Sequence, residues 1–405
     1  MTQAVSLGSS RQEEWRAVGP ICAAHFLSHY YMIMLAPVFA FVRADFRVSY
    51  TDLALALTVF NVVSAALQTP AGFLVDRVGA RRVLIAGVAL GSVAFAVAGL
   101  VDSFAVFVVM YGVAGLGNTA YHPADYALLS NGPPSRIGQL FSFHTFAGVL
   151  GGAVAPATML LMYSRVGWRG AYVGAALFGF AILGWLLAQR GPIERIAAGR
   201  HPDPADAGIA PGHLSWKFLL SPTILLNLIF FVLISLTGGL NTFLVVALGA
   251  LYGTSTTVAN SALTGLLLMN ALGVLVGGML ASRTTRHGAV AALCLAMSAL
   301  TTALIGLVDL SAVMLVAAAS VAGLFVGIVS PVRDMLVRAA TPRGAFGRVF
   351  GFVSSGFNIG SMIAPMVYGM FMDHGQPRTL FLFSAACSIL SITTVVFSVS
   401  RRGRS

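Results

Sequence analysis

Four histidines and one aspartate occur inside stretches of apolar residues, where ionisable side chains are uncommon. His25 and His29 are four residues apart and His122 and Asp125 are three apart, so each pair shares one face of a helix. His144 completes the group. Imidazole and carboxylate groups can exchange a proton near neutral pH once their surroundings tune them, and they are also transition-metal ligands. The group therefore predicts either a proton site or a metal site.

Arg333 and Asp334 form a second charged pair in another apolar stretch. The guanidinium group keeps its proton, and its planar shape suits a carboxylate or phosphonate group on a solute. We predict a solute-binding site made of His25, Tyr30, Tyr126, Arg333, Asp334 and Asn358. We assign proton coupling to Asp125, His29, His122 and His144. The alternative for each of these side chains is that it only joins neighbouring helices.

The composition shows what kind of element carries these residues. Of 405 residues, 58% are hydrophobic and only 9% are charged, and the mean hydropathy is +0.88. A soluble domain cannot hide so much apolar surface, so the chain is expected to lie in a membrane. A charge in hydrocarbon costs at least about 2.5–3.5 kcal/mol, so the ionisable residues should face the interior of a helix bundle or a wet cavity.

The apolar stretches have the length of membrane spans. Crossing a hydrocarbon layer of about 30 Å takes roughly 20 helical residues. We predict twelve spanning helices, roughly at 17–42, 52–75, 80–101, 104–130, 138–163, 168–189, 218–248, 257–281, 288–308, 311–338, 346–372 and 378–399. The predicted fold class is an all-α membrane protein with two pseudo-symmetric six-helix bundles.

The distribution of basic residues predicts the orientation. With the N-terminus inside, 18 of the 24 Lys and Arg residues lie on the inner side, 5 lie outside, and Arg333 lies within a span. Basic residues concentrate in cytoplasmic segments, so both termini are predicted to be cytoplasmic. Topology thus explains the net charge of +11, and no nucleic-acid partner is expected. Arginine far outnumbers the single lysine, Lys217, as is typical of a high-GC bacterial genome, so we expect a bacterial inner (cytoplasmic) membrane.

One long polar segment divides the chain near its middle. Its Arg, Asp, Pro and Gly residues cannot cross a membrane. We therefore predict an N-terminal six-helix bundle at 1–189, a cytoplasmic linker at 190–217 and a C-terminal six-helix bundle at 218–405.

The two halves repeat in sequence. GQLFSFHTFAGVLGGAVAP, from Gly138 to Pro156, aligns without gaps with GRVFGFVSSGFNIGSMIAP, from Gly347 to Pro365. HPADY at 122–126 aligns with SPVRD at 330–334, which puts Arg333 at the position of Asp125, and GFLVDR at 72–77 aligns with GMLASR at 278–283. Two homologous bundles that face each other indicate a rocking transporter with its site at their interface.

The connection between the second and third predicted spans has a specific pattern. It reads GFLVDRVGARR, from Gly72 to Arg82, and resembles the signature loop of the major facilitator superfamily. With the span count, the linker and the repeat, the likeness covers nearly the whole chain. The resemblance implies that spans one, four, seven and ten line a central cavity, where Asp125 and Arg333 would approach one another. It also implies a conformational latch that includes Gly72, Asp76, Arg77, Gly79, Arg81 and Arg82.

Asp76 is the central residue of that latch. A carboxylate at a helix end can pair with guanidinium groups and with the positive end of a neighbouring helix. The resemblance implies that this neighbour begins near Gly347 and that the contact holds the outward-open state. The alternative is that the arginines only set the topology. Ser282 occupies the equivalent position of the second half and has no carboxylate, so the latch is expected only in the first half.

Three further segments resemble one branch of the superfamily. They are HFLSH at 25–29, Tyr121-His122-Pro123, and SFH at 142–144 followed by Gly148, Gly151, Gly152 and Pro156. They are similar to the fosmidomycin-resistance-type branch, which is associated with efflux and often carries Asp where this chain has His29. The small residues also predict close contact between helix backbones.

These features together predict a proton-coupled secondary transporter of a small organic solute that works by alternating access. The resemblance favours efflux of an amphipathic compound. Arg333 favours the alternative of organic-anion uptake by proton symport, and the His and Asp group leaves transition-metal transport open. An enzyme is not expected, because the chain has no G-x-S-x-G, H-E-x-x-H or Walker-type pattern. We expect the solute, protons and membrane lipid as partners, a monomer, and no cofactor or resident metal. Cys22, Cys294 and Cys387 are interpreted as small core residues.

Overall fold

The computed structural model describes residues 11–129, 137–198, 216–341 and 346–402, and these ranges contain helices and short connections without a strand. The first half contains α1 (Arg11–Ile33), η1 (Ala36–Val38), α2 (Phe39–Phe46), α3 (Tyr50–Val78), α4 (Ala80–Ala98), α5 (Phe104–Asn118), α6 (Tyr121–Leu129), α7 (Ile137–Ala188) and α8 (Arg190–Ala198). The second half contains η2 (Trp216–Leu220), α9 (Pro222–Thr237), α10 (Gly239–Tyr252), α11 (Thr256–Arg283), α12 (His287–Leu307), α13 (Ala312–Ala340), α14 (Phe346–Asp373) and α15 (Pro377–Arg402).

The helices account for the twelve predicted spans. Ten stretches of the described residues are long and apolar enough to cross a membrane. One of these, Leu140–Ala188, is 49 residues long and contains two spans, because Gly167 breaks α7 with a positive φ of 69°. The remaining span is α14, which has 28 residues. The all-α, membrane-spanning fold class is therefore confirmed.

Three predicted spans are interrupted rather than continuous. The first continues from α1 through η1 into α2, the fourth changes from α5 to α6 between Asn118 and Tyr121, and the seventh changes from α9 to α10 at Gly238. Pro37 lies in η1 and Pro123 in the first turn of α6, and neither can donate a backbone hydrogen bond. Interrupted helices are tolerated at membrane depth where the protein itself satisfies the freed backbone groups.

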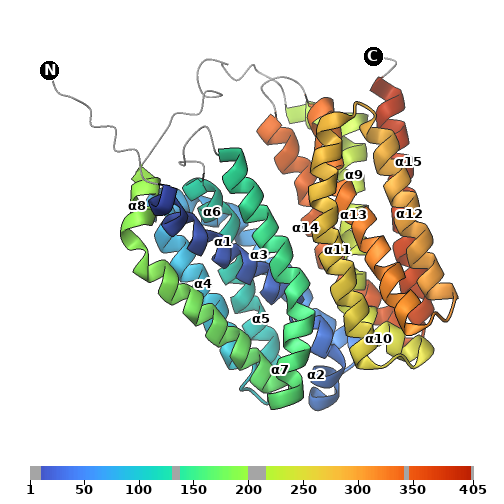
Figure 1. Cartoon of the computed structure of the whole chain (residues 1–405), viewed down its shortest axis with the longest axis horizontal. Helices are drawn as coiled ribbons and strands as arrows, with labels where there is room; N and C mark the ends of the chain where they lie inside the picture. Colours follow the sequence, from blue (N-terminus) through green and yellow to red (C-terminus); the bar gives the residue numbers. More distant parts are fainter. Residues whose placement is uncertain (1–10, 130–136, 199–215, 342–345, 403–405) are drawn as a thin grey trace.

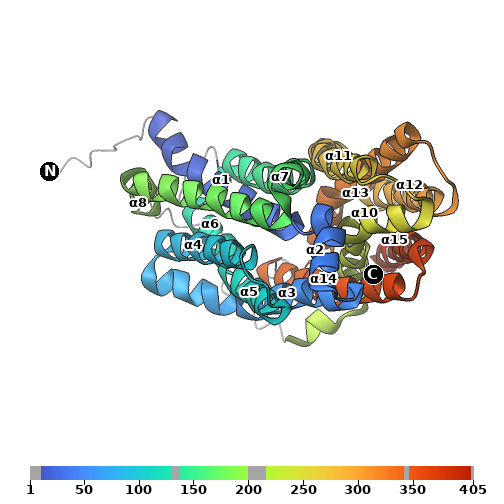
Figure 2. The ribbon, with the colours of Figure 1, turned by 90° about the horizontal axis from the view of Figure 1, so that it is seen from below.

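The helices form two groups that lie side by side, α1 to α8 and α9 to α15 (Figure 1). We call the end where α1 begins and α15 ends the inner end, and the opposite end, where α2 and α10 lie, the outer end. The groups meet mainly where α3 packs on α14 and α7 on α11 (Figure 2), and α10 also contacts η1 and α2. The ribbons of the groups approach at the outer end and separate toward the inner end (Figure 1).

Glycine allows the closest helix contacts, as the small-residue pattern predicts. A Cβ atom at Gly151 of α7 would overlap the backbone oxygen of Phe26 on α1. In the second half, a Cβ atom at Gly323 of α13 would overlap the backbone oxygen of Leu266 on α11. Because only glycine fits at these crossings, the backbones of each pair lie against each other.

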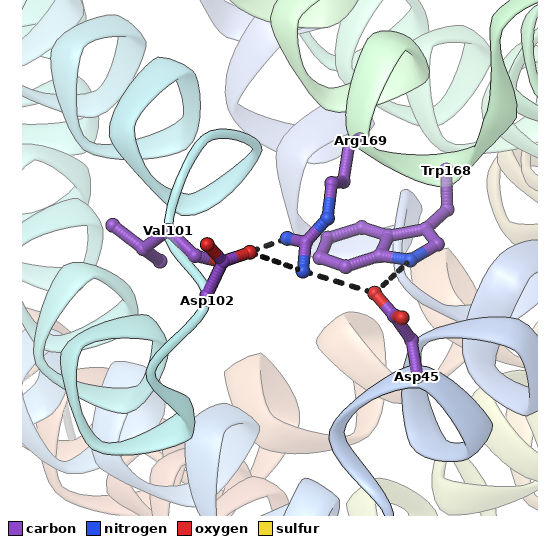
Figure 3. A network of polar contacts seen from close by, with 5 residues as sticks. All are labelled: Asp45, Val101, Asp102, Trp168 and Arg169. Carbon is purple, nitrogen blue, oxygen red and sulfur yellow. Dashed lines mark hydrogen bonds and ion pairs between the residues drawn. The ribbon is translucent and has the colours of Figure 1, made fainter.

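A polar network ties the outer end of the first group (Figure 3). Arg169, just after the break in α7, has its Nη2 atom 3.0 Å from Asp45 Oδ2 of α2 and 3.0 Å from Asp102 Oδ1 of the α4–α5 connection. Its Nη1 atom donates to the backbone oxygen of Val101 at 2.7 Å, and Trp168 Nε1 donates to Asp45 Oδ2 at 3.0 Å. One arginine therefore connects three segments that the sequence separates widely.

The segment predicted as a linker, 190–217, begins with a helix. Arg190–Ala198 forms α8, in which Arg190 Nε lies 2.9 Å from Glu194 Oε1 at i, i+4. Arg195 Nη2 reaches Glu13 Oε1 of α1 at 3.3 Å, so the first part of the segment packs on the first group. Residues 199–215 of the predicted linker lie outside the described residues.

Candidate functional site

The structure brings the five ionisable residues of the first half together. His25 and His29 come from α1, His122 and Asp125 from α6, and His144 from α7. The break between α5 and α6 starts a new helix at Tyr121, and this places His122 and Asp125 within its first turns. We call these five residues the histidine cluster.

Asp125 is at the centre of the histidine cluster. Its carboxylate oxygen Oδ2 lies 2.9 Å from His144 Nε2, which is a hydrogen bond, and 3.6 Å from His25 Nδ1. The rings of His25 and His144 are stacked with their centroids 3.7 Å apart and their planes at 20°. Asp125 and His144 are fully buried, so solvent cannot stabilise a charge on either of them.

His29 and His122 extend the histidine cluster on the far side of His25. Their ring centroids lie 4.8 Å and 5.2 Å from the His25 centroid, both in edge-on arrangements. Tyr126 adds a further ring, with its centroid 5.8 Å from that of His122 and 5.7 Å from that of His144. A continuous set of rings therefore runs from α1 to the surface, where the Tyr126 side chain is exposed.

Several polar atoms of the histidine cluster have no hydrogen-bond partner among the described residues. They are His25 Nδ1, His122 Nδ1, Asp125 Oδ1 and His144 Nδ1. Buried polar atoms are nearly always satisfied in folded proteins, and exceptions point to a functional role. Two of the four imidazoles, those of His144 and His25, lie beside the one carboxylate, so a proton held by either of them would form an ion pair with it. The cluster has the chemistry to hold one proton in several positions.

A glycine makes room for the rings. A Cβ atom at Gly148, one turn after His144 on α7, would lie 2.5 Å from His25 Cδ2 and 3.0 Å from His29 Cδ2. Any larger residue would force the His25 ring to move from its place beside Asp125. The glycine series quoted from the sequence therefore contributes directly to the geometry of the cluster.

The equivalent place in the second half is built differently. Arg333 Nε and Nη2 donate to Asp334 Oδ1 at 3.0 Å and 2.8 Å. The guanidinium carbon lies 4.5 Å from the ring centroid of Phe231 and 4.8 Å from that of Phe357. The Arg333 side chain is 11% exposed and that of Asp334 is 45% exposed. The arginine is therefore held by an acid and two rings of its own half.

The expected approach of Asp125 to Arg333 is not found in this structure. Asp125 has His144 and His25 as partners, and Arg333 has Asp334, Phe231 and Phe357. No ion pair joins Asp125 to Arg333 among the described residues, because each charge contacts neighbours of its own half, so their approach in another state stays a prediction.

The other predicted solute-site residues lie in different surroundings. The Tyr30 hydroxyl is hydrogen-bonded to Thr158 Oγ1 at 2.9 Å, and the side chain is buried in the first half. Asn358 is half-buried on α14, where its backbone oxygen accepts a hydrogen bond from Ser361 Oγ at 3.0 Å. The structure does not bring Tyr30 and Asn358 into one site with the histidine cluster through any hydrogen bond among the described residues.

The signature loop joins α3 to α4. Gly79 has a positive φ of 94°, which glycine adopts readily, and it ends α3 and starts α4. Arg81 Nη2 lies 3.4 Å from the backbone oxygens of Leu186 and Leu187 at the end of α7, while Arg77 and Arg82 are exposed. Gly72 has open space around it. The side chains of Asp76 and Arg348, and any contact near Gly347, lie outside the described part of the chain, so the latch stays a prediction.

Phe231 and Phe357 are site residues that the sequence reasoning missed. The repeat contains a signal for one of them, because the gapless alignment places Phe357 at the position of Gly148. In the second half the ring of Phe357 thus stands at the repeat position where the first half has Gly148, which leaves room for the histidine rings.

Three atoms of the histidine cluster have the right chemistry for a metal ion. His25, Asp125 and His144 each offer one ligand atom, and these atoms lie within 4.8 Å of one another. Imidazole nitrogen and carboxylate oxygen are common ligands at about 2.0–2.2 Å from zinc, so the side chains would have to converge further around an ion.

Comparison with known proteins agrees with this architecture. Residues 21–248 and 226–405 match the sequence profile of the Major Facilitator Superfamily. A solved bacterial homolog of the human lysosomal transporter Spinster, in an inward-facing and occupied conformation, superposes with a TM-score of 0.76 at 15% identity. The superposition covers 97% of this chain and 96% of that one, and at this identity it shows a shared fold.

Curated relatives match over shorter stretches. A probable L-galactonate transporter of Escherichia coli is 28% identical over 37% of this chain and 33% of its own length. A probable sulfoacetate transporter, SauU, of Cupriavidus necator is 28% identical over 42% of this chain and 39% of its own length. The drug efflux pump JefA of Mycobacterium tuberculosis is 30% identical over 40% of this chain and 31% of its own length. The chain thus spans well under half the length of each of these relatives.

Proposed function

Because the chain belongs to the Major Facilitator Superfamily, we propose that it is a proton-coupled secondary transporter that moves a small organic solute by alternating access. The family and the shared fold make it a multi-pass membrane transporter and not an enzyme. The finer proposal places it in a bacterial inner membrane as a monomer, with the inner end cytoplasmic. The excess of basic residues at that end supports this orientation.

The observation that supports the proposed proton coupling is the burial of Asp125 in a cluster with four histidines. With the carboxylate ionised and the imidazoles neutral, the buried cluster has a net negative charge, which is costly away from water. One added proton on His144 or Asp125 makes the cluster neutral overall. The free energy of the buried state therefore depends on whether the cluster holds this one proton. A conformational change that exposes the cluster to one side of the membrane would allow the proton to be released to that side or taken up from it.

We propose efflux of an amphipathic compound as the direction of transport. The similarity to JefA and the resemblance to the fosmidomycin-resistance-type branch support this direction. The similarity to probable transporters of L-galactonate and sulfoacetate supports the alternative of organic-anion uptake by proton symport. Arg333 was the main residue in favour of the anion, and its engagement with Asp334 and two phenylalanine rings weakens that support.

Flux measurements on Asp125→Asn test the proposal. An asparagine keeps hydrogen bonding at position 125 but cannot ionise, so gradient-driven accumulation in proteoliposomes should be lost while solute exchange without a gradient continues. Asp309→Asn is the matched control, because it removes an exposed acid outside the cluster and should transport like the wild type. Accumulation by Asp125→Asn at the wild-type rate would remove the proposed proton site.

Transition-metal transport is the competing function, and the three ligand atoms within 4.8 Å are the reason to test it. The same proteoliposomes would be loaded with a metal-sensitive dye and exposed to Zn²⁺, Co²⁺ or Ni²⁺. Under the proposal made here, neither the wild type nor His144→Gln moves these ions. Ion flux by the wild type that His144→Gln abolishes would replace the organic solute with a metal ion as the cargo.

A further inference from the structure

Asp373, at the outer end of α14, contacts the beginning of α3 in the other half of the molecule. Its Oδ1 atom accepts a hydrogen bond from the backbone N–H of Tyr50 at 2.7 Å, and its Oδ2 atom accepts one from that of Thr51 at 2.8 Å. The two hydrogen bonds connect segments more than 300 residues apart in sequence. This contact thus joins the halves at the end where they approach each other (Figure 1).

The start of α3 has unsatisfied backbone groups that fit this carboxylate. The first N–H groups of a helix have no partner within the helix. Ser49 is the N-cap, and its Oγ atom accepts the N–H of Asp52 at 2.9 Å, while Asp52 Oδ2 accepts the N–H of Ser49 at 3.0 Å. The capping box therefore leaves the N–H groups of Tyr50 and Thr51 open, and Asp373 satisfies both.

The backbone of α14 comes close enough only because of a glycine. Gly369 lies one turn before Asp373, and a Cβ atom there would be 3.0 Å from Thr51 Cα and 3.1 Å from Thr51 N. A side chain at this position would push the two helices apart and lengthen both hydrogen bonds of Asp373. The sequence of α14 thus provides both the acid and the space that the acid needs.

Neutral hydrogen bonds continue the same interface deeper between the halves. Asn61 Nδ2 donates to the backbone oxygen of Ser361 at 2.9 Å, and Thr58 Oγ1 to that of Met362 at 3.4 Å. Bonds to an ionised acceptor are roughly twice as strong as neutral ones, and a helix N-terminus adds a favourable field. Asp373 is exposed, so water weakens this field, but it adds two hydrogen bonds to a charged acceptor to the neutral ones of the interface.

The charge on Asp373 persists in the contact. Partial burial would raise the pKa of the carboxyl, but the hydrogen bonds from Thr51 and Tyr50 outweigh burial and hold the pKa below its ordinary value. The carboxylate is thus ionised across the physiological pH range. Release of the contact would require the helices to move apart rather than the acid to take up a proton.

We propose that Asp373 is a gate residue of the transport cycle, whose contact with the start of α3 holds the outer end closed and must break whenever that end opens. The inference rests on the proposed alternating access. It adds to the latch expected at Asp76, because α3 and α14 would each carry an acid at their C-terminal end that faces the N-terminus of the other. The two contacts would then form in opposite states of the cycle.

The test compares Asp373→Asn with Asp52→Asn. Both variants remove one carboxylate that accepts a backbone hydrogen bond at the start of α3. Asp52 belongs to α3 itself, whereas Asp373 belongs to α14 in the other half. Thr58→Cys, in a background with Cys22, Cys294 and Cys387 replaced by Ser, reports outer opening through its reaction with a polar maleimide. Purified protein in detergent is used, so neither a gradient nor a solute is needed.

We expect Asp373→Asn to raise the labelling rate at position 58 by roughly tenfold, the size expected for loss of hydrogen bonds to a charged acceptor. Asp52→Asn should leave that rate near the wild-type value while lowering the melting temperature, since it only weakens the start of α3. Asp373→Glu should retain part of the closure because it keeps the charge. Equal labelling rates in Asp373→Asn and wild type, or an equal rise in Asp52→Asn, would overturn the proposal.

These outcomes are separate from those that test proton coupling. If Asp125→Asn accumulates solute normally but Asp373→Asn opens the outer end, the coupling proposal fails and the gate remains. If labelling does not change but Asp125→Asn loses coupling, the gate fails and the transport proposal remains.

Discussion

Gly148 is the residue on which the geometry of the histidine cluster depends most directly. A Cβ atom there would meet the His25 ring at 2.5 Å and 2.6 Å, and the buried rings around it leave little space for adjustment. Overpacking of this kind costs roughly 1–3 kcal/mol of stability. We expect Gly148→Ala to lower the melting temperature and to reduce gradient-driven flux, because the His25 ring must shift from its place beside Asp125 and His144.

Gly152 provides a matched control one turn further along α7. A Cβ atom there would meet Ile33 at 3.6 Å and the backbone oxygen of His29 at 4.0 Å, which are ordinary contact distances. Gly152→Ala should therefore retain both the melting temperature and the flux of the wild type. Equal losses in the two variants would mean that the effect comes from α7 packing in general and not from the histidines.

The membership of the histidine cluster was predictable from sequence, but its contacts were not. An ionisable residue in an apolar span must face the protein interior, and helical spacing placed His25 with His29 and His122 with Asp125. The partner of Asp125 depends on how α6 and α7 pack, and spacing along one helix carries no information about that. For the same reason the contact of Phe231 with the Arg333 guanidinium group could not be predicted.

At the scale of helices, the proposed gate and the expected latch both lie on one pair, α3 and α14. They connect the halves, and the outer contact at Asp373 is present in this structure. The inner contact expected at Asp76 would form when the inner end closes. With Asp373 at the outer end and Asp76 at the inner end of the same helix pair, the state closed at the outer end and the state closed at the inner end would be mutually exclusive.

This arrangement predicts the sign of the effect of Asp76→Asn. Loss of the expected inner latch should disfavour the outward-open state, so labelling at Thr58→Cys should become slower, opposite to the effect of Asp373→Asn. Turnover in proteoliposomes should also fall, while the amount of inserted protein stays unchanged. Wild-type transport and wild-type labelling in Asp76→Asn would remove the latch hypothesis.

Helix existence was more predictable than helix continuity. Hydropathy predicted the apolar spans because apolar length is a property of composition alone, and ten stretches of the described residues have that length and composition. The interruptions at Gly238 and before Tyr121 depend on whether neighbouring helices satisfy the freed backbone groups, and hydropathy does not contain that information. The helix α8 was missed because its Arg, Glu and Pro residues made the segment too polar to be recognised as a packed element.

At the scale of the whole molecule, the two halves share a sequence repeat but differ in chemistry. The first half buries an acid among imidazoles, and the second clamps an arginine between an acid and two rings. Repeated bundles allow the halves to rock about a common interface. Under the proposed function, this difference confines proton chemistry to the first half, so a change in the charge of that half would bias the movement of one bundle against the other.

The last prediction tests whether the charges of the two halves interact directly. If Asp125 and Arg333 formed a pair across the interface, the exchange Asp125→Arg with Arg333→Asp would restore the pair and with it active transport. In this structure an arginine at position 125 would be buried among histidines, and an aspartate at position 333 would lie beside Asp334. Both replacements leave buried charges without suitable partners, which is strongly destabilising.

We therefore expect the double variant to transport no better than either single variant and to melt at a lower temperature than both. Gradient-driven flux and thermal unfolding of the three proteins, reconstituted at equal amounts, would measure this. Additive losses of stability would indicate independent sites, since coupling is found between residues in contact. Recovery of active transport in the double variant would instead show that Asp125 and Arg333 meet in another state of the cycle, and would assign Asp125 to a gate between the halves and leave the histidines as the proton carriers.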